Sequence, residues 1–347
     1  MKIGILIGSL IPGGIEKSAI EEYIYLKKQG YAVALYTLTP SRSDYQYEDL
    51  ISKDDVINLY EYYPRVLRKA FNFPFFHFLN SHYLLAPFFV KKYFKEHTGD
   101  VDILLSHGSI ATFSAVSIAR QCDIPYVFFL WDPIIYILDK VYSYTFLRHL
   151  FWLLRPIVVH YEKNTIRYAH KVLTCSSVHA ALLEERYHVT STVIYPGCYP
   201  LEAVSEHKEN YILAFTRWDH DKHPLFLLEL LEDTQADLVI AGKWTNENDY
   251  EEFTAKIKQL GLEGRVTIYS YLTKEKLKEL SFKALVWIHP NFEAFGMGGL
   301  EAAACGCPII IPAGSGVTEL FQGGVHGFFP GGARQGENSR LYKYITA

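Results

Sequence analysis

The sequence has 347 residues, which is long for one domain and comfortable for two domains of about 150 residues each. Hydrophobic residues make up 49% of the chain and charged residues 21%, so a largely disordered protein is excluded. The net charge of −4 gives no general attraction for nucleic acid. No uncharged apolar stretch reaches the roughly 18 residues that a membrane-spanning helix needs.

The cysteines do not suggest a disulfide framework or a zinc site. There are five, an odd number, and no two of them have the Cys-x-x-Cys spacing of common zinc and redox motifs. We therefore expect no metal site and a reducing, cytoplasmic location. The cysteines are Cys122, Cys175, Cys198, Cys305 and Cys307.

The N-terminal segment predicts a strand, a helix and a second strand. Residues 2–8 form a continuous apolar run, as in a strand that is buried on both faces. Between residues 15 and 26 apolar residues recur at helical spacing, and Gly30 supplies a helix stop. Residues 31–38 form the next apolar run. The segment is therefore typical of a βαβ unit.

The same alternation returns beyond residue 100 and restarts after a polar, turn-rich segment at residues 197–210. Alternating short strands and helices predict the α/β class with parallel sheets. We expect two Rossmann-like, doubly wound domains, residues 1–200 and 201–330, which face each other across a ligand-binding cleft. The further predicted strands are 101–106, 125–130, 171–175, 192–194, 211–216, 237–241, 265–269, 284–288 and 308–311, and the further helices are 110–121, from 178, from 224, 250–260, 274–281 and 298–305.

Residues 290–312, PNFEAFGMGGLEAAACGCPIIIP, carry the most informative motif. Glu293 follows a predicted strand, and a glycine-rich run then leads into a helix whose first N–H groups favour phosphate. The glycines let the backbone approach a ligand closely. Glu301 comes about one turn into this helix, so both carboxylates can face the same ligand. Two solvated carboxylates at a helix end are the alternative.

This segment resembles the Glu-x7-Glu signature of the retaining family 4 glycosyltransferases, which have the GT-B fold. The resemblance implies that Glu293 reaches the donor sugar and that Glu301 holds the ribose hydroxyls. It also implies that the backbone amides at Phe295, Gly296 and Met297 contact the sugar and the distal phosphate. The nucleotide sugar, UDP- or GDP-linked, would be a substrate, and no cofactor or metal ion is implied.

Arg217 and Lys222 lie five residues apart in the loop after the first strand of the second domain, TRWDHDKHP. Two such cations can flank one diphosphate, although a surface pair is the alternative. The resemblance assigns them to the leaving group, so they join Glu293 as candidate catalytic residues. Asp219 and Asp221 look like a metal-binding Asp-x-Asp, but the two cations already supply the charge stabilisation of a metal.

The N-terminal domain offers fewer candidates. Gly14, in the glycine pair after the first strand, resembles the glycine loop with which the family approaches the donor; a plain tight turn is the alternative. Where the family usually has a histidine, this chain has Trp131 followed by Asp132. We take Asp132 and His107 as candidates for the N-domain side of the cleft, although a lone histidine is more often structural.

The resemblance implies transfer of a sugar, with retention of configuration, to a hydroxyl of a glycan or lipid-linked acceptor, as in the synthesis of cell-surface glycans or glycolipids. The departing phosphate would help to remove the proton, so charge stabilisation would replace a strong base. Two alternatives stay open. One is a nucleotide-sugar epimerase, and the other is a non-catalytic protein that binds nucleotide sugars or docks on a membrane.

Two aromatic and basic stretches and the C-terminal tail lie outside the motifs described above. Aromatic and basic residues crowd residues 62–94 and 142–155, either as helices packed on the core or as a peripheral contact with anionic lipid on the inner face of the membrane. Residues 331–347 show no sustained helical spacing, whereas the family continues with a helix that braces the N-domain. We expect this tail to be atypical and truncated, and the brace to be missing.

Overall fold

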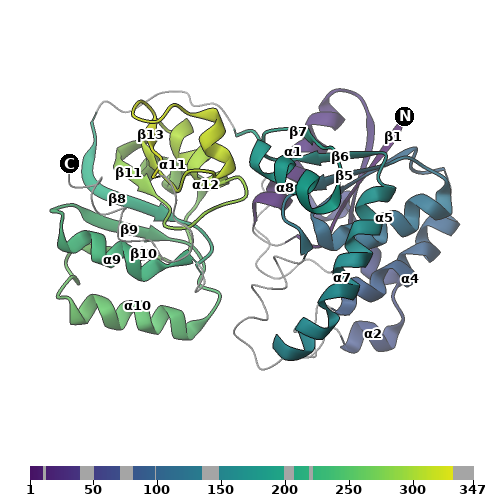
Figure 1. Ribbon diagram of the computed structural model, residues 1–347, viewed down its shortest axis with the longest axis horizontal. Coiled ribbons are helices and arrows are strands. Elements are labelled where there is room, and N and C mark those ends of the chain that lie inside the picture. Colours follow the sequence, from purple (N-terminus) through teal and green to yellow (C-terminus); the bar gives the residue numbers. More distant parts are fainter. Residues whose placement is uncertain are drawn as a thin grey trace. The chain divides into compact units, whose positions relative to one another are not determined.

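The computed structural model describes residues 1–10, 13–39, 51–70, 81–97, 99–134, 148–198, 207–218 and 222–330. The chain divides into an N-terminal unit, Met1–Tyr195, and a C-terminal unit, Pro196–Ala347, each with a parallel sheet and helices (Figure 1). The prediction of an α/β protein with two doubly wound sheets is confirmed. The predictions for Asp219, Asp221 and the tail at residues 331–347 fall outside the described residues.

The described part of the N-terminal unit contains a seven-stranded parallel sheet in the order β3-β2-β1-β4-β5-β6-β7. Its strands are β1 (Lys2–Ile7), β2 (Ala32–Thr37), β3 (Val56–Asn58), β4 (Ile103–His107), β5 (Tyr126–Leu130), β6 (Lys171–Thr174) and β7 (Thr192–Val193). Its helices are α1 (Gly14–Lys28), η1 (Lys53–Asp55), η2 (Leu59–Tyr62), α2 (Arg65–Ala70), α4 (Ser81–Glu96), α5 (Ser109–Cys122), α7 (Arg148–Tyr168) and α8 (Ser177–Tyr187).

Helices cover both faces of this sheet, which explains why its strands are apolar throughout. Side chains alternate along β1: Ile3 and Ile5 pack with residues of α1, whereas Leu6 points to the other face. There it joins a cluster that includes residues of α4, α5, α7 and α8. The continuous apolar run at residues 2–8 was therefore a reliable sign of a central strand.

The described part of the C-terminal unit contains a six-stranded parallel sheet in the order β10-β9-β8-β11-β12-β13. Its strands are β8 (Glu209–Phe215), β9 (Asp237–Ala241), β10 (Val266–Tyr269), β11 (Ala284–Ile288), β12 (Ile309–Ile310) and β13 (Gly327–Phe328). Its helices are α9 (Pro224–Glu232), α10 (Glu247–Gln259), α11 (Lys274–Lys283), α12 (Met297–Ala304) and η4 (Gly316–Leu320). Apolar side chains of α9 and α10 pack on one face, and Gly298 and Gly299 of α12 contact Trp287 on the other.

The two sheets have the same topology around the first strand of their unit. In each unit the strand order runs outwards from a pair, β1 with β4 and β8 with β11, where the winding of the chain reverses. Ligands bind outside the carboxyl ends of the strands at such a reversal point. None of the helices in the described ranges is long and apolar enough to cross a membrane.

Candidate functional site

The residues predicted from the sequence follow the four strands at the two reversal points. Gly14 comes after β1, His107 ends β4, Arg217 comes after β8 and Glu293 comes after β11. Because all strands in each sheet are parallel, these positions lie at the carboxyl edge of their own sheet. The topology therefore gathers the candidates of each unit at the edge where ligands bind.

Glu293 and Lys222 form an ion pair in the C-terminal unit. The Lys222 ammonium donates to Glu293 Oε1 across 71 positions of sequence, and Nε2 of His289 lies 3.2 Å from the same oxygen. The side chain of Lys222 is 11% exposed and that of Glu293 25% exposed. The structure thus joins two residues that the resemblance assigns to different parts of the donor, and adds a histidine that sequence reasoning missed.

Two buried residues, Ser315 and His289, make polar contacts with the loop that carries Glu293. Its N–H donates to the hydroxyl of Ser315, which is fully buried, at 3.2 Å. His289, 4% exposed, lies 2.8 Å through Nδ1 from the carbonyl of Asn291, so both of its ring nitrogens face oxygen atoms. A polar residue at the end of the buried strand β11, directly before the motif, was the available signal for His289.

Trp218 anchors the loop that carries Arg217. The indole of Trp218 is fully buried and donates to the carbonyl of Ala241 at 2.9 Å. Its backbone N–H donates to the carbonyl of Lys243 at 2.9 Å, and its carbonyl accepts from the backbone N–H of Thr245 at 2.8 Å. The loops after β8 and β9 are thereby joined, and the exposed residues Arg217 and Lys243 are both held at this edge.

Helix α12 begins at Met297, one residue before the predicted start. Gly296 precedes it with φ of 100°, a left-handed conformation that favours glycine. Phe295 is buried, and its carbonyl accepts from Val317 at 2.7 Å. Glu301 is the fifth residue of the helix and half-buried. The N-terminus of α12 thus starts immediately after the Glu293 loop, as an anion site at a helix terminus requires.

The glycines inside α12 have a packing role that the sequence did not predict. A Cβ on Gly298 would lie 3.1 Å from the Trp287 ring, and a Cβ on Gly299 would lie 3.0 Å from it. These two glycines therefore let the helix pack closely on Trp287.

In the N-terminal unit, Gly14 is the first residue of α1. His107 is 1% exposed, because its ring nitrogens face Glu22 of α1 at 3.0 Å and the indole N–H of Trp131 at 3.5 Å. Its ring also stacks on Phe129. The ring of His107 is thus closed off from solvent, and the side chain at this position that reaches the surface is the 32% exposed Glu22.

Asp132 is the more accessible of the two N-domain candidates. Its carboxylate is 44% exposed and lies 3.5 Å from Nε2 of His179 at the start of α8. The hydroxyl of Ser109, at the start of α5, donates to the carbonyl of Asp132. Nothing in the local sequence around His179 marked it as a partner of Asp132, because the two residues follow different strands.

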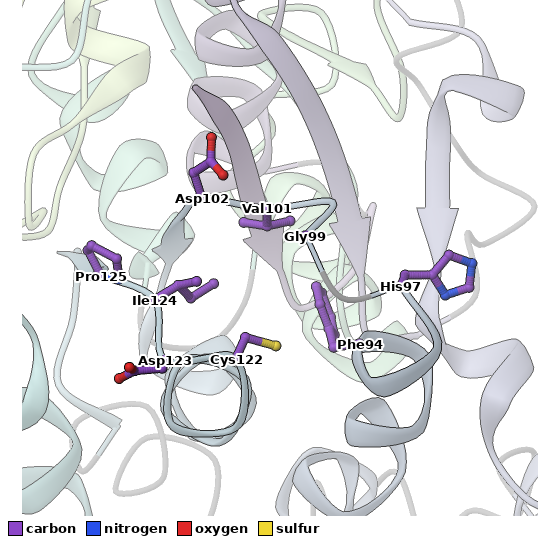
Figure 2. Close-up of a pocket in the computed structure, with 9 residues that line it drawn as sticks. All are labelled: Phe94, His97, Gly99, Val101, Asp102, Cys122, Asp123, Ile124 and Pro125. Carbon is purple, nitrogen blue, oxygen red and sulfur yellow. The ribbon is translucent and has the colours of Figure 1, made fainter.

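A cavity of about 280 Å³ lies at the amino-terminal edge of the N-terminal sheet (Figure 2). It is lined by the end of α4, by Val101 before β4, and by Cys122 and Ile124 at the turn that leads into β5. It contains none of the residues predicted for the site. This cavity is at the wrong end of the strands for the chemistry inferred from the motifs.

Across the described ranges, no disulfide joins the cysteines, and no group of three or more His, Cys, Asp or Glu side chains is arranged to hold a metal ion. Burial raises the pKa of Cys175 and of Cys307 to about 12. Both thiols are therefore poor nucleophiles near neutral pH.

Two family models match the chain. Glycosyltransferase Family 4 covers residues 12–200, and glycosyl transferases group 1 covers residues 202–333. The chain belongs to the family 4 glycosyltransferases. The resemblance found in residues 290–312 is thus confirmed at the level of the family.

Curated relatives match shorter segments. An uncharacterized glycosyltransferase of Methanocaldococcus jannaschii is 30% identical over 126 residues, which are 35% of this chain and 32% of that protein. The tRNA-queuosine alpha-mannosyltransferase of Drosophila melanogaster is 35% identical over 102 residues, 28% of this chain and 26% of that one. The matched part of the chain thus spans about a third or less of the length of these relatives.

Solved structures match over the whole chain. HepE of Anabaena in complex with UDP and glucose has a TM-score of 0.71 at 21% identity and covers all of this chain and 89% of its own. Sucrose-phosphate synthase of Thermosynechococcus elongatus has a TM-score of 0.72 at 17% identity and covers 99% and 88%. The protein has the GT-B fold of these glycosyltransferases.

Proposed function

We propose that this family 4 glycosyltransferase moves a sugar from a nucleotide-sugar donor to an acceptor hydroxyl with retention of anomeric configuration and without a metal ion. One observation carries the proposal: the Lys222–Glu293 pair, with His289 beside it, lies directly before the N-terminus of α12 at the carboxyl edge of the sheet. A cation, a carboxylate and a helix N-terminus together suit a sugar diphosphate.

The reaction uses charge rather than a strong base. The acceptor oxygen bonds to the anomeric carbon as the bond from that carbon to the phosphate oxygen breaks, and the nucleoside diphosphate leaves with the electron pair. The proton of the acceptor hydroxyl passes to the departing phosphate. Arg217, Lys222 and the N–H groups that open α12 stabilise the growing negative charge, and such groups are worth about 10²–10³ in rate each.

Before the donor binds, Lys222 pairs with Glu293 and holds its carboxylate in place in a half-buried position. The diphosphate then supplies a second anion for Lys222, and Glu293 becomes available to the hydroxyls of the donor sugar. Glu301 holds the ribose. Structural neighbours were solved with UDP, with UDP and glucose, and with UDP-glucose, which supports a UDP-linked donor ahead of a GDP-linked one.

The kinetic test uses UDP-glucose in excess EDTA with Arg217→Ala and Glu301→Ala. We expect Arg217→Ala to lower kcat about 10²–10³-fold, because phosphate charge grows only as the bond breaks. Glu301→Ala should raise the donor KM about tenfold with a smaller effect on kcat, because the ribose is bound equally in the ground and transition states.

Lys256→Ala and Glu251→Ala on α10 are the matched controls and should behave as wild type. If Arg217→Ala changed only KM, Arg217 would not act on the leaving group. Loss of activity in EDTA with recovery on adding manganese would contradict the metal-free mechanism.

We further propose that the acceptor is a glycan or lipid-linked sugar and that the enzyme works at the cytoplasmic face of a membrane. Among the described residues of 62–94, Tyr93 and Phe94 are buried, as a core helix requires. Phe88, however, is 71% exposed on the same helix, α4, near the exposed Lys91 and Lys92. This surface combines an apolar residue with cations, which suits anionic lipid.

Co-sedimentation with vesicles that contain phosphatidylglycerol tests this contact. The double variant Lys91→Glu/Lys92→Glu should lose most binding at low salt, because each basic residue near an anionic surface contributes about 1 kcal/mol. Lys256→Glu/Lys258→Glu on α10 carries the same change of charge and should bind as wild type. Absence of wild-type binding at low salt would leave α4 as a core helix only.

A further inference from the structure

The loop after β5 makes polar contacts with three different helices, α5, α7 and α8. Ser109 of α5 donates to the carbonyl of Asp132, and Glu162 of α7 accepts from the N–H of Ile134. His179 of α8 faces the Asp132 carboxylate. Three different helices therefore fix a short turn at the carboxyl edge of the N-terminal sheet.

Glu162 is a buried carboxylate that has no role in the donor site. It is 1% exposed, and its two oxygens accept from Ile134 N–H at 2.5 Å and from the Tyr187 hydroxyl at 2.6 Å. A buried carboxyl group whose two oxygens both accept hydrogen bonds resists displacement, because breaking either bond leaves a buried oxygen without a partner. The backbone on the C-terminal side of Asp132 is thereby locked to α7 and α8.

His179 is fixed as tightly. It is 3% exposed, and its Nδ1 lies 3.2 Å from the hydroxyl of Ser176, the N-cap of α8. The Ser176 oxygen already accepts from the His179 backbone N–H, so its own hydrogen can be donated to Nδ1. When Ser176 donates to Nδ1, a neutral ring carries its proton on Nε2, which faces Asp132.

Asp132 itself is placed to bind a ligand. One carboxylate oxygen faces His179, while the side chain is 44% exposed. A carboxylate accepts hydrogen bonds from hydroxyls and repels phosphate. An exposed carboxylate on a rigid turn at the ligand-binding edge therefore suits a polyhydroxylated neutral ligand rather than the diphosphate of the donor.

We infer that Asp132 accepts hydrogen bonds from the hydroxyls of a sugar acceptor, and that His179 is the positioning residue that fixes its carboxylate. The inference rests on the proposed transfer reaction and names the N-terminal residues that recognise its second substrate. It assigns sugar chemistry, rather than an aliphatic alcohol, to the acceptor.

The experiment uses the full chain, UDP-glucose as donor and a panel of p-nitrophenyl glycosides as acceptors. Acceptor KM, donor KM and the slow hydrolysis of UDP-glucose by water are measured for Asp132→Asn, His179→Ala and His179→Gln. Saturation-transfer NMR measures binding of the same glycosides independently of turnover. Melting temperatures report on folding.

Asp132→Asn should raise the acceptor KM about tenfold or more, with donor KM and hydrolysis within about twofold of wild type, because the neutral amide oxygen of Asn accepts a weaker hydrogen bond than a charged carboxylate. His179→Ala should have a smaller effect in the same direction. His179→Gln should restore acceptor KM, because its amide nitrogen can reach the position of Nε2. Asp123→Asn, at the opposite edge of the sheet, is the control and should change nothing.

An unchanged acceptor KM and unchanged glycoside binding in Asp132→Asn would overturn the inference while leaving transfer intact. Equal damage from His179→Gln and His179→Ala would remove the positioning role. If wild type bound glycosides through Asp132 but transferred no sugar, the proposed function would fail and the recognition site would stand. Wild type that neither binds nor uses any glycoside would overturn the site itself.

Discussion

The ion pair between Lys222 and Glu293 is largely shielded from water, so the two charges depend on each other. Removing one of them leaves the other with less compensation. We expect Lys222→Met and Glu293→Gln each to lower the free energy of unfolding by about 1–2 kcal/mol, less than for a fully buried pair. The double variant should be more stable than the sum of the two effects predicts.

Urea unfolding of the two single variants and the double variant measures this coupling. The exposed pair Lys276–Glu279 on α11 is the control and should show far weaker coupling, because solvent screens it. Additive effects for Lys222 and Glu293 would mean that their contact does not persist in solution.

At this scale the sequence predicts the residues of the motifs better than their partners. Glu293, Arg217 and Lys222 could be proposed because a local phrase carries them. Ser315 could not, because it contacts Glu293 only through the folding of the chain. His289 lies four residues before Glu293, and its one signal in the sequence is a polar residue at the end of a buried strand. The contact between Asp132 and His179 connects residues that follow two different strands, β5 and β6, so the local sequence spacing cannot predict it.

At the scale of elements, the loops after β8 and β9 approach so closely that one position excludes a side chain. Gly242 has φ of 127°, and a Cβ there would lie 1.8 Å from the carbonyl oxygen of Thr216. We expect Gly242→Ala to lower the free energy of unfolding by about 3 kcal/mol, through strain and backbone displacement. Activity should fall with it, because the Arg217 loop is joined to this one.

Thermal and urea unfolding measure the effect, with Gly264→Ala as the matched control. A Cβ at Gly264 meets nothing within 4 Å, so that variant should be neutral or slightly stabilised. Equal stability of the two variants would show that the loops separate readily.

The long periodic elements could be predicted because apolar residues repeat along them, as in β1 and α1. Two short edge strands could not: β3 has three residues and β13 two, which is too few for a pattern. The two-residue edge strand β7 was predicted, at residues 192–194. The close packing of α12 on Trp287 was also hidden, because a glycine in sequence does not show whether it faces a ligand or a ring.

At the scale of the whole molecule, each unit contains a buried thiol whose pKa is raised. Burial raises the pKa of Cys175 and of Cys307 to about 12, from a reference value of 9.0. Between these values the unfolded chain loses protons that the folded chain keeps. The free energy of unfolding therefore falls as pH rises from about 9 to 12, and the contribution is fully present below about 9.

Urea midpoints measured under reducing conditions from neutral to alkaline pH check this expectation. Burial also raises the pKa of Tyr126 and Tyr211, which adds to the slope with the same sign. Cys307→Ala should be less stable at neutral pH and show a shallower decline. A flat profile would mean that these groups are already open to solvent.

The contact between α12 and Trp287 also places an intrinsic fluorophore beside the start of the helix. Trp287 is buried under the glycines that begin α12, and its ring stacks on His289 at 5.8 Å between centroids. Fluorescence from this indole depends on how closely the helix packs and on the charge of the neighbouring imidazole. We therefore expect binding of the proposed diphosphate donor at the helix terminus to change the intrinsic fluorescence of this indole, without an attached label.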